Sequence, residues 1–341
     1  MVRALGLLSG GLDSTLAAKL LIDQGIEVHA VNFTSPFCTC TPKSAGCASV
    51  LTAVKQLGDI PLKRIVLGDE YLDMVKSPRH GYGRGMNPCI DCRIMKIRKA
   101  AEYMREICAL FLFTGEVLGQ RPMSQHKLAI DIIDRESGMA GLTLRPLSAR
   151  LFPPTVPEQN GWVDRSRLLA INGRSRKSQI ALASNKGIID YRCPAGGCLL
   201  TEPHFAARLK DYFDNCEKPS CADVPLLKIG RHFRMADRGE IIVAHDAAEG
   251  EKIVGLRRPG NTVLVPVGFS APVVLFTGAN KAAAAAKMAE FTNHHVPDDA
   301  AIEIISDNGI RTLKLMEYIT NNTLLLGSQE TPTVQPKERC E

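Results

Sequence analysis

The sequence predicts an α/β fold, with a Rossmann-like parallel sheet covered by helices on both faces and a smaller α+β domain after it. Short apolar runs alternate with segments of helical spacing, and strands that alternate with helices pair in parallel. The first apolar run also leads through a glycine-rich turn directly into a helix. The apolar runs lie at 4–8, 27–33, 65–67 and 110–114, and helical segments at 48–57 and 94–107.

The pattern changes twice after residue 150. A proline-rich stretch at 151–162 predicts a surface loop, and helical spacing returns at 165–171 and 175–184. Beyond a segment rich in Cys and Pro, 216–225, strands are expected at 240–244, 262–267 and 272–276 and an Ala-rich helix at 279–291. We therefore expect a first domain over 1–217, a linker at 218–225, an α+β domain over 226–328 and a disordered polar tail at 329–341.

Composition narrows the class of protein. The chain has 341 residues, of which 45% are hydrophobic, and no apolar run reaches the 18 residues of a membrane span. Gly10, Gly11 and Asp13 interrupt the N-terminus too early for a secretory signal, so we expect a cytoplasmic protein with no membrane partner. A net charge of +6 permits an RNA partner without requiring one. Eleven cysteines, several in close pairs, then favour ligands or reactive thiols over disulfides.

The glycine-rich turn predicts an anion site. Its sequence, Ser9-Gly10-Gly11-Leu12-Asp13-Ser14, places backbone amides and serine hydroxyls at the start of a helix, where anions bind. The carboxylate of Asp13 would repel a phosphate unless a divalent cation lay between them. The turn therefore predicts Mg²⁺ together with a phosphate ligand.

The S-G-G-x-D-S pattern resembles the signature of the PP-loop ATP pyrophosphatases, which cleave ATP between the α- and β-phosphates and adenylate a carbonyl oxygen. The resemblance implies that ATP is the nucleotide, that Ser9, Gly10, Gly11, Asp13 and Ser14 contact its phosphates, and that Asp13 is catalytic. It also implies that Asn32 and Phe33, at the end of the second strand, lie beside the adenosine.

A second segment, Thr114-Gly-Glu-Val-Leu-Gly-Gln120, resembles the T-G-E-x-L-G-Q of bacterial tRNA 4-thiouridine synthases, in which a Ser-Gln pair also follows. The resemblance implies nucleotide contacts from Arg93, Gly115 and Gln125, with Gln120 nearby.

Two cysteine segments resemble a different family, the tRNA 2-thiouridylases. Asn87-Pro-Cys-Ile-Asp-Cys92 matches their N-P-C-x-x-C, which implies that Cys89 is catalytic. The stretch 196–205 matches their G-x-C-x-x-x-E-x-x-F and implies the same for Cys198. These resemblances cover residues 1–212 and leave open whether oxygen 2 or oxygen 4 of the uracil is replaced. The segment 228–250 resembles the RNA-binding domain of ribosome-quality-control proteins.

The cysteines allow two metal sites and two ways of carrying sulfur. Cys89, Cys92 and Cys198 would hold a [4Fe–4S] cluster with one iron open, and Cys193 is the rival to Cys198 as third ligand. Alternatively, all four would hold a structural zinc. Sulfur would be carried on the open iron or as a persulfide on Cys89 or Cys198. Two further expectations concern other cysteines: Cys38, Cys40 and Cys47 lie near the site or in a surface loop, and Cys108 lies in the core.

The leading hypothesis is an ATP-dependent tRNA uridine sulfurtransferase, whose partners are tRNA and a sulfur donor, either a cysteine desulfurase or inorganic sulfide. The RNA backbone would pass three runs of basic residues: Lys76, Arg79 and Arg84; Arg93, Lys96, Arg98 and Lys99; Arg174, Arg176 and Lys177. His126 is either catalytic or structural. Two alternatives stay open: a PP-loop enzyme with a small-molecule acceptor and a structural zinc, and an inactive RNA-binding module. The oligomeric state is not predicted.

Overall fold

The computed structural model describes residues 1–38, 46–191, 198–279, 281–292 and 296–323. The chain divides into two compact units, Met1–Ala222 and Asp223–Glu341, and the boundary falls inside the segment 218–225. The tail expected at 329–341 lies outside the described residues. Across the described ranges, no helix has the length and apolar character that crossing a bilayer requires.

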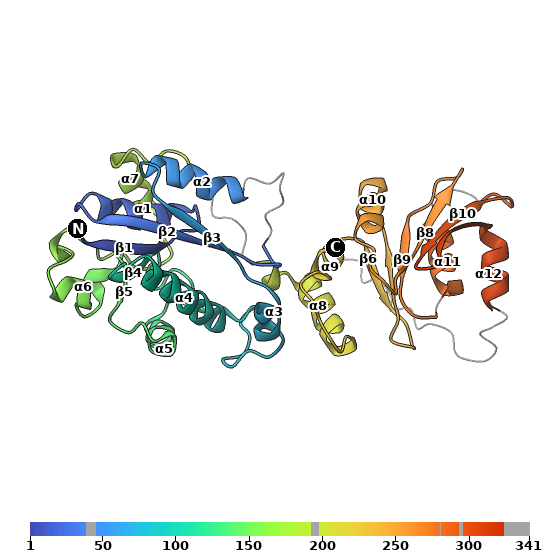
Figure 1. The fold of residues 1–341 in the computed structure, drawn as a ribbon, viewed down its shortest axis with the longest axis horizontal. Helices are drawn as coiled ribbons and strands as arrows, with labels where there is room; N and C mark the ends of the chain where they lie inside the picture. Colours follow the sequence, from blue (N-terminus) through green and yellow to red (C-terminus); the bar gives the residue numbers. More distant parts are fainter. Residues whose placement is uncertain (39–45, 192–197, 280, 293–295, 324–341) are drawn as a thin grey trace. The chain divides into compact units, whose positions relative to one another are not determined.

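The first unit is built on a five-stranded parallel sheet, as predicted (Figure 1). Its strand order is β3-β2-β1-β4-β5. The strands are β1 (Arg3–Leu7), β2 (Glu27–Thr34), β3 (Leu62–Val66), β4 (Phe111–Thr114) and β5 (Thr143–Leu144).

Helices cover both faces of this sheet (Figure 1). Residues of α1, α2 and α7 share one hydrophobic cluster with Ala4 and Phe113, and residues of α4 and α5 share another with Leu5 and Val31. Neighbouring strand residues point to opposite faces, so both faces of the parallel sheet are buried. The helices are α1 (Leu12–Ile22), α2 (Gly46–Gln56), α3 (Asp69–Lys76), α4 (Cys89–Glu106), α5 (Lys127–Ser137), α6 (Val156–Gln159), α7 (Lys177–Asn185) and α8 (Pro203–Asn215), with 3-10 turns η1 (Ala149–Leu151), η2 (Arg165–Arg167) and η3 (Leu199–Thr201).

The strand order reverses at β1, which has β2 on one side and β4 on the other. In open α/β sheets, ligands bind beyond the carboxyl ends of the strands at such a reversal, because the connections leave in opposite directions there. The glycine-rich turn follows β1 and the T-G-E segment begins at the end of β4. The fold therefore brings these two segments to the same crevice.

The helix expected at 165–171 is wrong, because only the turn η2 forms there. The backbone amides of Leu169 and Ile171 donate to the carbonyls of Pro146 and Leu147 over 3.0 and 2.8 Å. These amides therefore cannot donate to the carbonyls four residues earlier, which is the hydrogen bond that an α-helix requires. The Asp164 carboxylate, which accepts from Ser166 N at 2.8 Å, caps the single turn that remains.

The second unit is a six-stranded antiparallel sheet with helices on both faces, which agrees with the predicted α+β class. Ile241 and Val243 pack with α11 and α12, whereas Ile242 and Ala244 pack with α10 on the other face. The sequence missed β6, β10, β11, α10 and α12. The elements are α9 (Val224–Leu227), β6 (Arg231–Arg234), β7 (Glu240–Val243), α10 (Ala247–Gly255), β8 (Thr262–Val267), β9 (Val274–Phe276), α11 (Lys281–Glu290), β10 (Ala301–Ser306), β11 (Gly309–Lys314) and α12 (Leu315–Thr323).

Candidate active site

The turn after β1 is held in shape by its own serines. Ser14 Oγ donates to the carbonyl of Gly11 at 3.0 Å, and the hydroxyls of Ser9 and Ser14 lie 3.1 Å apart. Gly10 has a φ of +75°, and a Cβ there would come within 2.5 Å of the backbone of Ser49 and Val50 in α2. The residue that precedes α1, Gly11, has no side chain to cap the helix. The first amides of α1 are therefore available to an anion.

Asp13 is joined to the loop after β4. Gln120 Nε2 donates to Oδ2 of Asp13 over 3.0 Å. Three buried oxygens, Asp13 Oδ1, Gln120 Oε1 and Gln125 Oε1, have no hydrogen-bond partner among the described residues. Buried acceptors without partners are costly, and oxygen atoms are the ligands that Mg²⁺ prefers. The site therefore fits a Mg²⁺ ion bound with a nucleotide.

The T-G-E segment packs directly on α1. A Cβ on Gly115 would overlap the backbone of Asp13 and Ser14, so only glycine fits at this contact. The next residue, Glu116, is 2% exposed and pairs with Arg93 at 3.3 Å and with Arg145 at 3.1 Å. Burial raises the pKa of Glu116, but the two guanidinium groups outweigh burial and hold it below its usual value. Glu116 thereby fixes Arg93 beside the crevice.

The remaining residues expected to contact the nucleotide are Asn32, Phe33 and Gln125. Asn32 Nδ2 donates to the carbonyl of Leu8 at 2.8 Å, which ties the end of β2 to the start of the turn. Phe33 is half-buried and packs against the hydrophobic cluster under α4. Gln125 is 4% exposed, and its backbone carbonyl accepts a hydrogen bond from the amide of Gly119 at 2.6 Å.

Polar side chains also lie at the start of helix α7, a region for which the sequence predicts only contacts with RNA. Lys186, which follows the C-terminal end of α7, pairs with Asp23 at the end of α1 over 2.6 Å. Gly173, which precedes the start of α7, donates its amide to the carbonyl of Leu118 over 2.7 Å. The helix therefore begins on the side of the loop that carries Gln120. Arg176 Nε and both polar atoms of Gln179 are buried there without a hydrogen-bond partner among the described residues.

Cys89 and Cys92 lie in the first turn of α4, whereas the sequence predicts that this helix begins only at Ile94. The buried Tyr71 donates its hydroxyl to Cys92 Sγ at 3.2 Å. Burial and the Cys92 thiol raise the pKa of Cys89, whereas Arg93 and Arg121 act to lower it. Arg121, which directly follows Gln120, was not expected in the site.

Cys198 reaches the same region from a segment far along the chain. The amide of Met86, just before the cysteine pair, donates to the carbonyl of Leu200 at 2.9 Å. Burial, with a smaller contribution from Cys92, raises the pKa of Cys198 to about 11, although the backbone at Leu200 and the Lys96 ammonium act to lower it. Phe37, which directly precedes Cys38, packs its ring 6.1 Å from that of Tyr71, so Cys38 lies on the side of the sheet that carries Cys92.

The thiols of Cys89 and Cys198 fit a metal group by their chemistry, since burial and the neighbouring Cys92 disfavour their thiolate forms and a cationic group would favour them. Cys89, Cys92 and Cys198 are not in disulfides. However, no three His, Cys, Asp or Glu side chains in the described part of the chain stand close enough together to hold a metal ion. Cys193 and Cys40 lie outside the described residues, as does the side chain of Cys47.

Several other expected residues have structural contacts. The ring of His126 caps α5 by accepting from Ala129 N at 3.3 Å, which agrees with the structural alternative. Arg98 donates to the carbonyl of Glu136, and Lys99 pairs with Glu70 at 2.7 Å. The prediction of Cys108 in the core is wrong. It follows the end of α4 with a φ of +52° and is exposed.

Comparisons with known proteins agree with the two units. Residues 2–149 match the family described as "Thiamine biosynthesis protein (ThiI)", and residues 230–321 match the family described as "NFACT protein RNA binding domain". The tRNA-specific 2-thiouridylase MnmA of Dichelobacter nodosus is 25% identical over 218 residues, which cover 60% of this chain and 54% of that protein. That of Francisella tularensis subsp. tularensis (strain WY96-3418) is 25% identical over 241 residues, 66% of this chain and 62% of that protein. The chain thus spans less than two thirds of these relatives.

The chain also aligns with two solved structures whose names describe enzymes of RNA thiolation. A 4-thiouridine synthetase–RNA complex with bound ATP aligns with a TM-score of 0.37 and 19% identity over 67% of this chain and 52% of that one. The U34-tRNA thiolase NcsA from Methanococcus maripaludis with its [4Fe-4S] cluster aligns with a TM-score of 0.33 and 16% identity over 67% and 73%. The family matches agree with the resemblances found in the sequence, since residues 2–149 match the ThiI family and residues 230–321 match the NFACT RNA-binding domain.

Proposed function

We propose that the chain is an ATP-dependent tRNA uridine sulfurtransferase. The observation that carries the proposal is the connection between the glycine-rich turn and the cysteines. Gly115 packs against the backbone of Asp13 and Ser14, and the next residue, Glu116, pairs at 3.3 Å with Arg93, which directly follows Cys92. A nucleotide on the turn and a sulfur on the cysteines would therefore meet across the loop after β4. The relatives named tRNA-specific 2-thiouridylase, which are 25% identical to this chain over 218 and 241 residues, support the same activity.

The first half of the reaction activates the uracil. Its carbonyl oxygen attacks the α-phosphorus of ATP, and the bond to the β-phosphate breaks so that pyrophosphate leaves. The amides at the start of α1 and the hydroxyls of Ser9 and Ser14 bind the departing pyrophosphate. Mg²⁺, which Asp13, Gln120 and Gln125 would hold through their partnerless oxygens, supplies charge neutralisation for the phosphates. Arg93, fixed by Glu116, lies beside the crevice to bind the nucleotide.

The second half replaces the activated oxygen. A sulfur nucleophile attacks the ring carbon, and the C–O bond breaks so that AMP leaves with the oxygen. Cys89 and Cys198 are the proposed catalytic thiols. If one of them carried a persulfide, its outer sulfur would bond to the ring carbon as AMP leaves. The other thiol would then attack the inner sulfur and break the S–S bond, which leaves a Cys89–Cys198 disulfide for a thiol reductant to reduce. A [4Fe–4S] cluster held by Cys89, Cys92 and Cys198 would instead supply an iron without a protein ligand as the place where sulfur binds. Zinc at these cysteines is the alternative metal. A cysteine desulfurase would donate the outer sulfur of a persulfide, and inorganic sulfide would be the donor for the open iron.

We assign the residues 226–328 to RNA binding, on the match of 230–321 to the NFACT family. In this unit Arg231 lies over the ring of Phe291 at 4.9 Å, and Lys287 lies over that of Phe233 at 4.6 Å. These contacts hold long cationic side chains in fixed positions, where they would meet phosphates with less loss of entropy.

The proposal is tested with purified protein, prepared anaerobically and given tRNA, Mg-ATP and sulfide. The proposal expects a thiouridine in the digested tRNA together with AMP and pyrophosphate. The Asp13→Asn variant is the control, which should yield neither. ATP cleavage that a small metabolite stimulates and tRNA does not would contradict the tRNA assignment. RNA binding with no ATP cleavage at all would contradict an enzyme.

A further inference from the structure

The segment between α3 and α4 contacts both the start of α4, which carries Cys89 and Cys92, and the stretch of chain that carries Cys198. One end of it is tied to the first turn of α4 and the other to the residues after Cys198. Asp91 lies between Cys89 and Cys92 in the sequence, is 9% exposed, and accepts hydrogen bonds from this segment. Both ties lie within the first unit of the chain.

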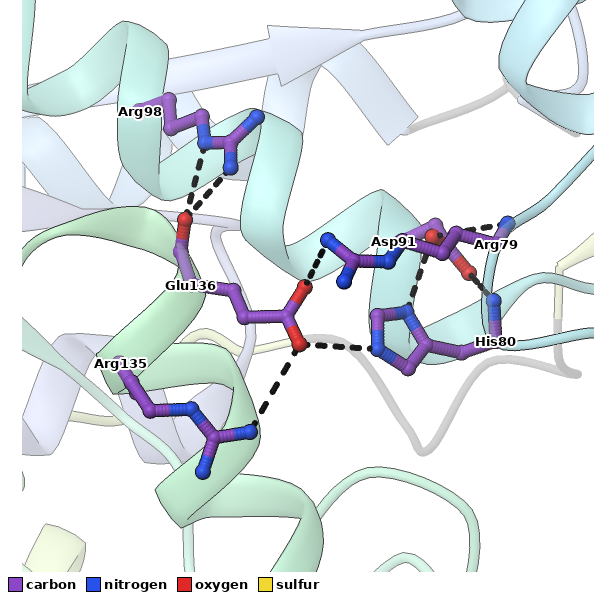
Figure 2. Close-up of polar contacts among 6 residues, drawn as sticks. All are labelled: Arg79, His80, Asp91, Arg98, Arg135 and Glu136. Carbon is purple, nitrogen blue, oxygen red and sulfur yellow. Dashed lines mark hydrogen bonds and ion pairs between the residues drawn. The ribbon is translucent and has the colours of Figure 1, made fainter.

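The first tie is a network around His80 (Figure 2). The Asp91 carboxylate accepts from the amides of Arg79 and His80 at 3.2 and 3.0 Å, and its Oδ1 lies 3.1 Å from His80 Nδ1. The other ring nitrogen of His80 lies 3.2 Å from Glu136 near the end of α5. The imidazole is thus held between carboxylates of two helices, one of which carries the cysteine pair.

The second tie is a close backbone contact. Gly85 has a φ of +63°, and a Cβ on it would overlap the carbonyl oxygen of Leu200 and lie 3.4 Å from Thr201 Cα. The neighbouring Met86 donates its amide to that same carbonyl at 2.9 Å. Leu200 lies two residues after Cys198, so this contact sets how closely Cys198 approaches α4.

We propose that residues 79–87 form a brace that positions Cys198 against Cys92, with His80 and Gly85 as its positioning residues. The brace is one continuous segment tied at both ends, so a displacement of either end moves one thiol relative to the other. Only glycine allows the second tie, because any side chain would separate residue 85 from Leu200. This inference rests on the proposed function and extends it. It adds to that reaction two positioning residues, His80 and Gly85, that contact neither the nucleotide nor the sulfur.

The brace is tested by bridging thiols in the full-length, metal-free protein with dibromobimane. Each of its two bromomethyl groups forms a C–S bond with a thiol as bromide leaves, and peptide mass spectrometry identifies which cysteines are joined. We expect a peptide bridged between Cys92 and Cys198 in the wild type and the loss of most of it in Gly85→Ala. Gly81→Ala is the matched control, because Gly81 has a φ of +70° and open space around it.

His80→Ala tests the other tie and keeps the proposal falsifiable if Gly85→Ala does not fold. Its control is Arg135→Ala, since the Arg135 side chain is 68% exposed and meets Glu136 only at 3.7 Å. We expect less bridged peptide in His80→Ala and no change in Arg135→Ala. A folded Gly85→Ala or His80→Ala protein with wild-type bridging overturns the brace.

Thiolation is measured separately, so that the two proposals fail independently. If the brace acts in the proposed reaction, Gly85→Ala lowers the rate of thiolation by about 100-fold while ATP binding stays unchanged. Thiolation at the wild-type rate in that variant overturns the brace and leaves the proposed function intact. If the wild type makes no thiouridine but Gly85→Ala still loses the bridged peptide, the proposed function fails and the brace stands.

Discussion

Gln120 donates from its side-chain amide to Oδ2 of Asp13 over 3.0 Å, although 107 positions separate the two residues. This bond orients the carboxylate of the glycine-rich turn, and Oδ1 of Asp13 and Oε1 of Gln120 have no hydrogen-bond partner within the described part of the chain. Residues that orient a metal ligand contribute strongly to metal affinity. Under the proposed function, Gln120 would therefore help Asp13 to hold the cation.

Replacing Gln120 by alanine should lower the rate of pyrophosphate release by about 10–100-fold, because Asp13 loses its orientation and one cation ligand disappears. The loss should be reduced by raising the Mg²⁺ concentration. Gln159→Ala, at an exposed glutamine whose amide donates to the Pro154 carbonyl, is the control. Pyrophosphate release at the wild-type rate and Mg²⁺ dependence in Gln120→Ala would refute this role.

The contact between Gly115 and α1 predicts a steric effect on nucleotide binding. In Gly115→Ala the added Cβ must push the backbone of Asp13 and Ser14 away from β4, so we expect ATP affinity, measured by calorimetry, to fall by about tenfold or more, which corresponds to about 1.4 kcal/mol. Gly68→Ala is the control, because nothing lies within 4 Å of the position its Cβ would take. Equal losses of ATP affinity in both variants would contradict the explanation.

The buried pair of Glu116 and Arg145 predicts a large, pH-dependent effect on stability. Glu116→Gln leaves two guanidinium groups facing a neutral amide, so the free energy of unfolding at pH 7 should fall by about 3–5 kcal/mol. Burial raises the pKa of Glu116, but Arg93 and Arg145 lower it overall from its usual 4.5. The carboxylate therefore stabilises the fold fully above pH 4.5 and loses that effect as the pH falls through the folded-state pKa.

The difference in unfolding free energy between wild type and Glu116→Gln should accordingly shrink in acid, as measured by urea denaturation. Glu70→Gln provides the comparison, since the Glu70 side chain is 53% exposed and its pair with Lys99 is worth little. A difference that stays constant from pH 7 to pH 3 would show that the charge of Glu116 is not what stabilises the site.

The site thiols predict which cysteines matter for metal content and activity. Alanine at Cys89, Cys92 or Cys198 should abolish thiolation and the iron and sulfide content of anaerobically prepared protein. Cys108→Ala should keep both, because Cys108 is exposed and follows the end of α4. Colourless wild-type protein with one zinc per chain and full activity would rule out the cluster and favour the zinc alternative.

The sequence predicted what depends on residues close together in the chain. The alternation of strands and helices gives the parallel sheet, and the glycines and serines of 9–14 give the anion turn at the start of α1. The helix predicted at 165–171 failed because its amides bond to Pro146 and Leu147, partners that no local pattern specifies. Cys108 was placed wrongly because an apolar neighbourhood does not reveal which side chains turn outward once the helix has ended.

Contacts across the fold were the part of the site that the sequence did not predict. Tyr71 reaches Cys92 from α3, and Arg121 approaches Cys89 from the loop after β4. Arg121 had a signal, since it directly follows the T-G-E-x-L-G-Q segment. Tyr71 had none, because a buried tyrosine in an amphipathic helix is indistinguishable from a core residue until its hydroxyl partner is known.

The central claim is that a nucleotide on the turn at 9–14 and a sulfur on the cysteines act on one uracil. It is tested most directly by digesting tRNA after incubation with anaerobic protein, Mg-ATP and sulfide, and measuring thiouridine and pyrophosphate in the same samples. The account predicts one pyrophosphate for each thiouridine, with both products lost in Asp13→Asn and thiouridine lost in Cys89→Ala. Thiouridine that forms without ATP, or at the wild-type level in Asp13→Asn, would contradict it.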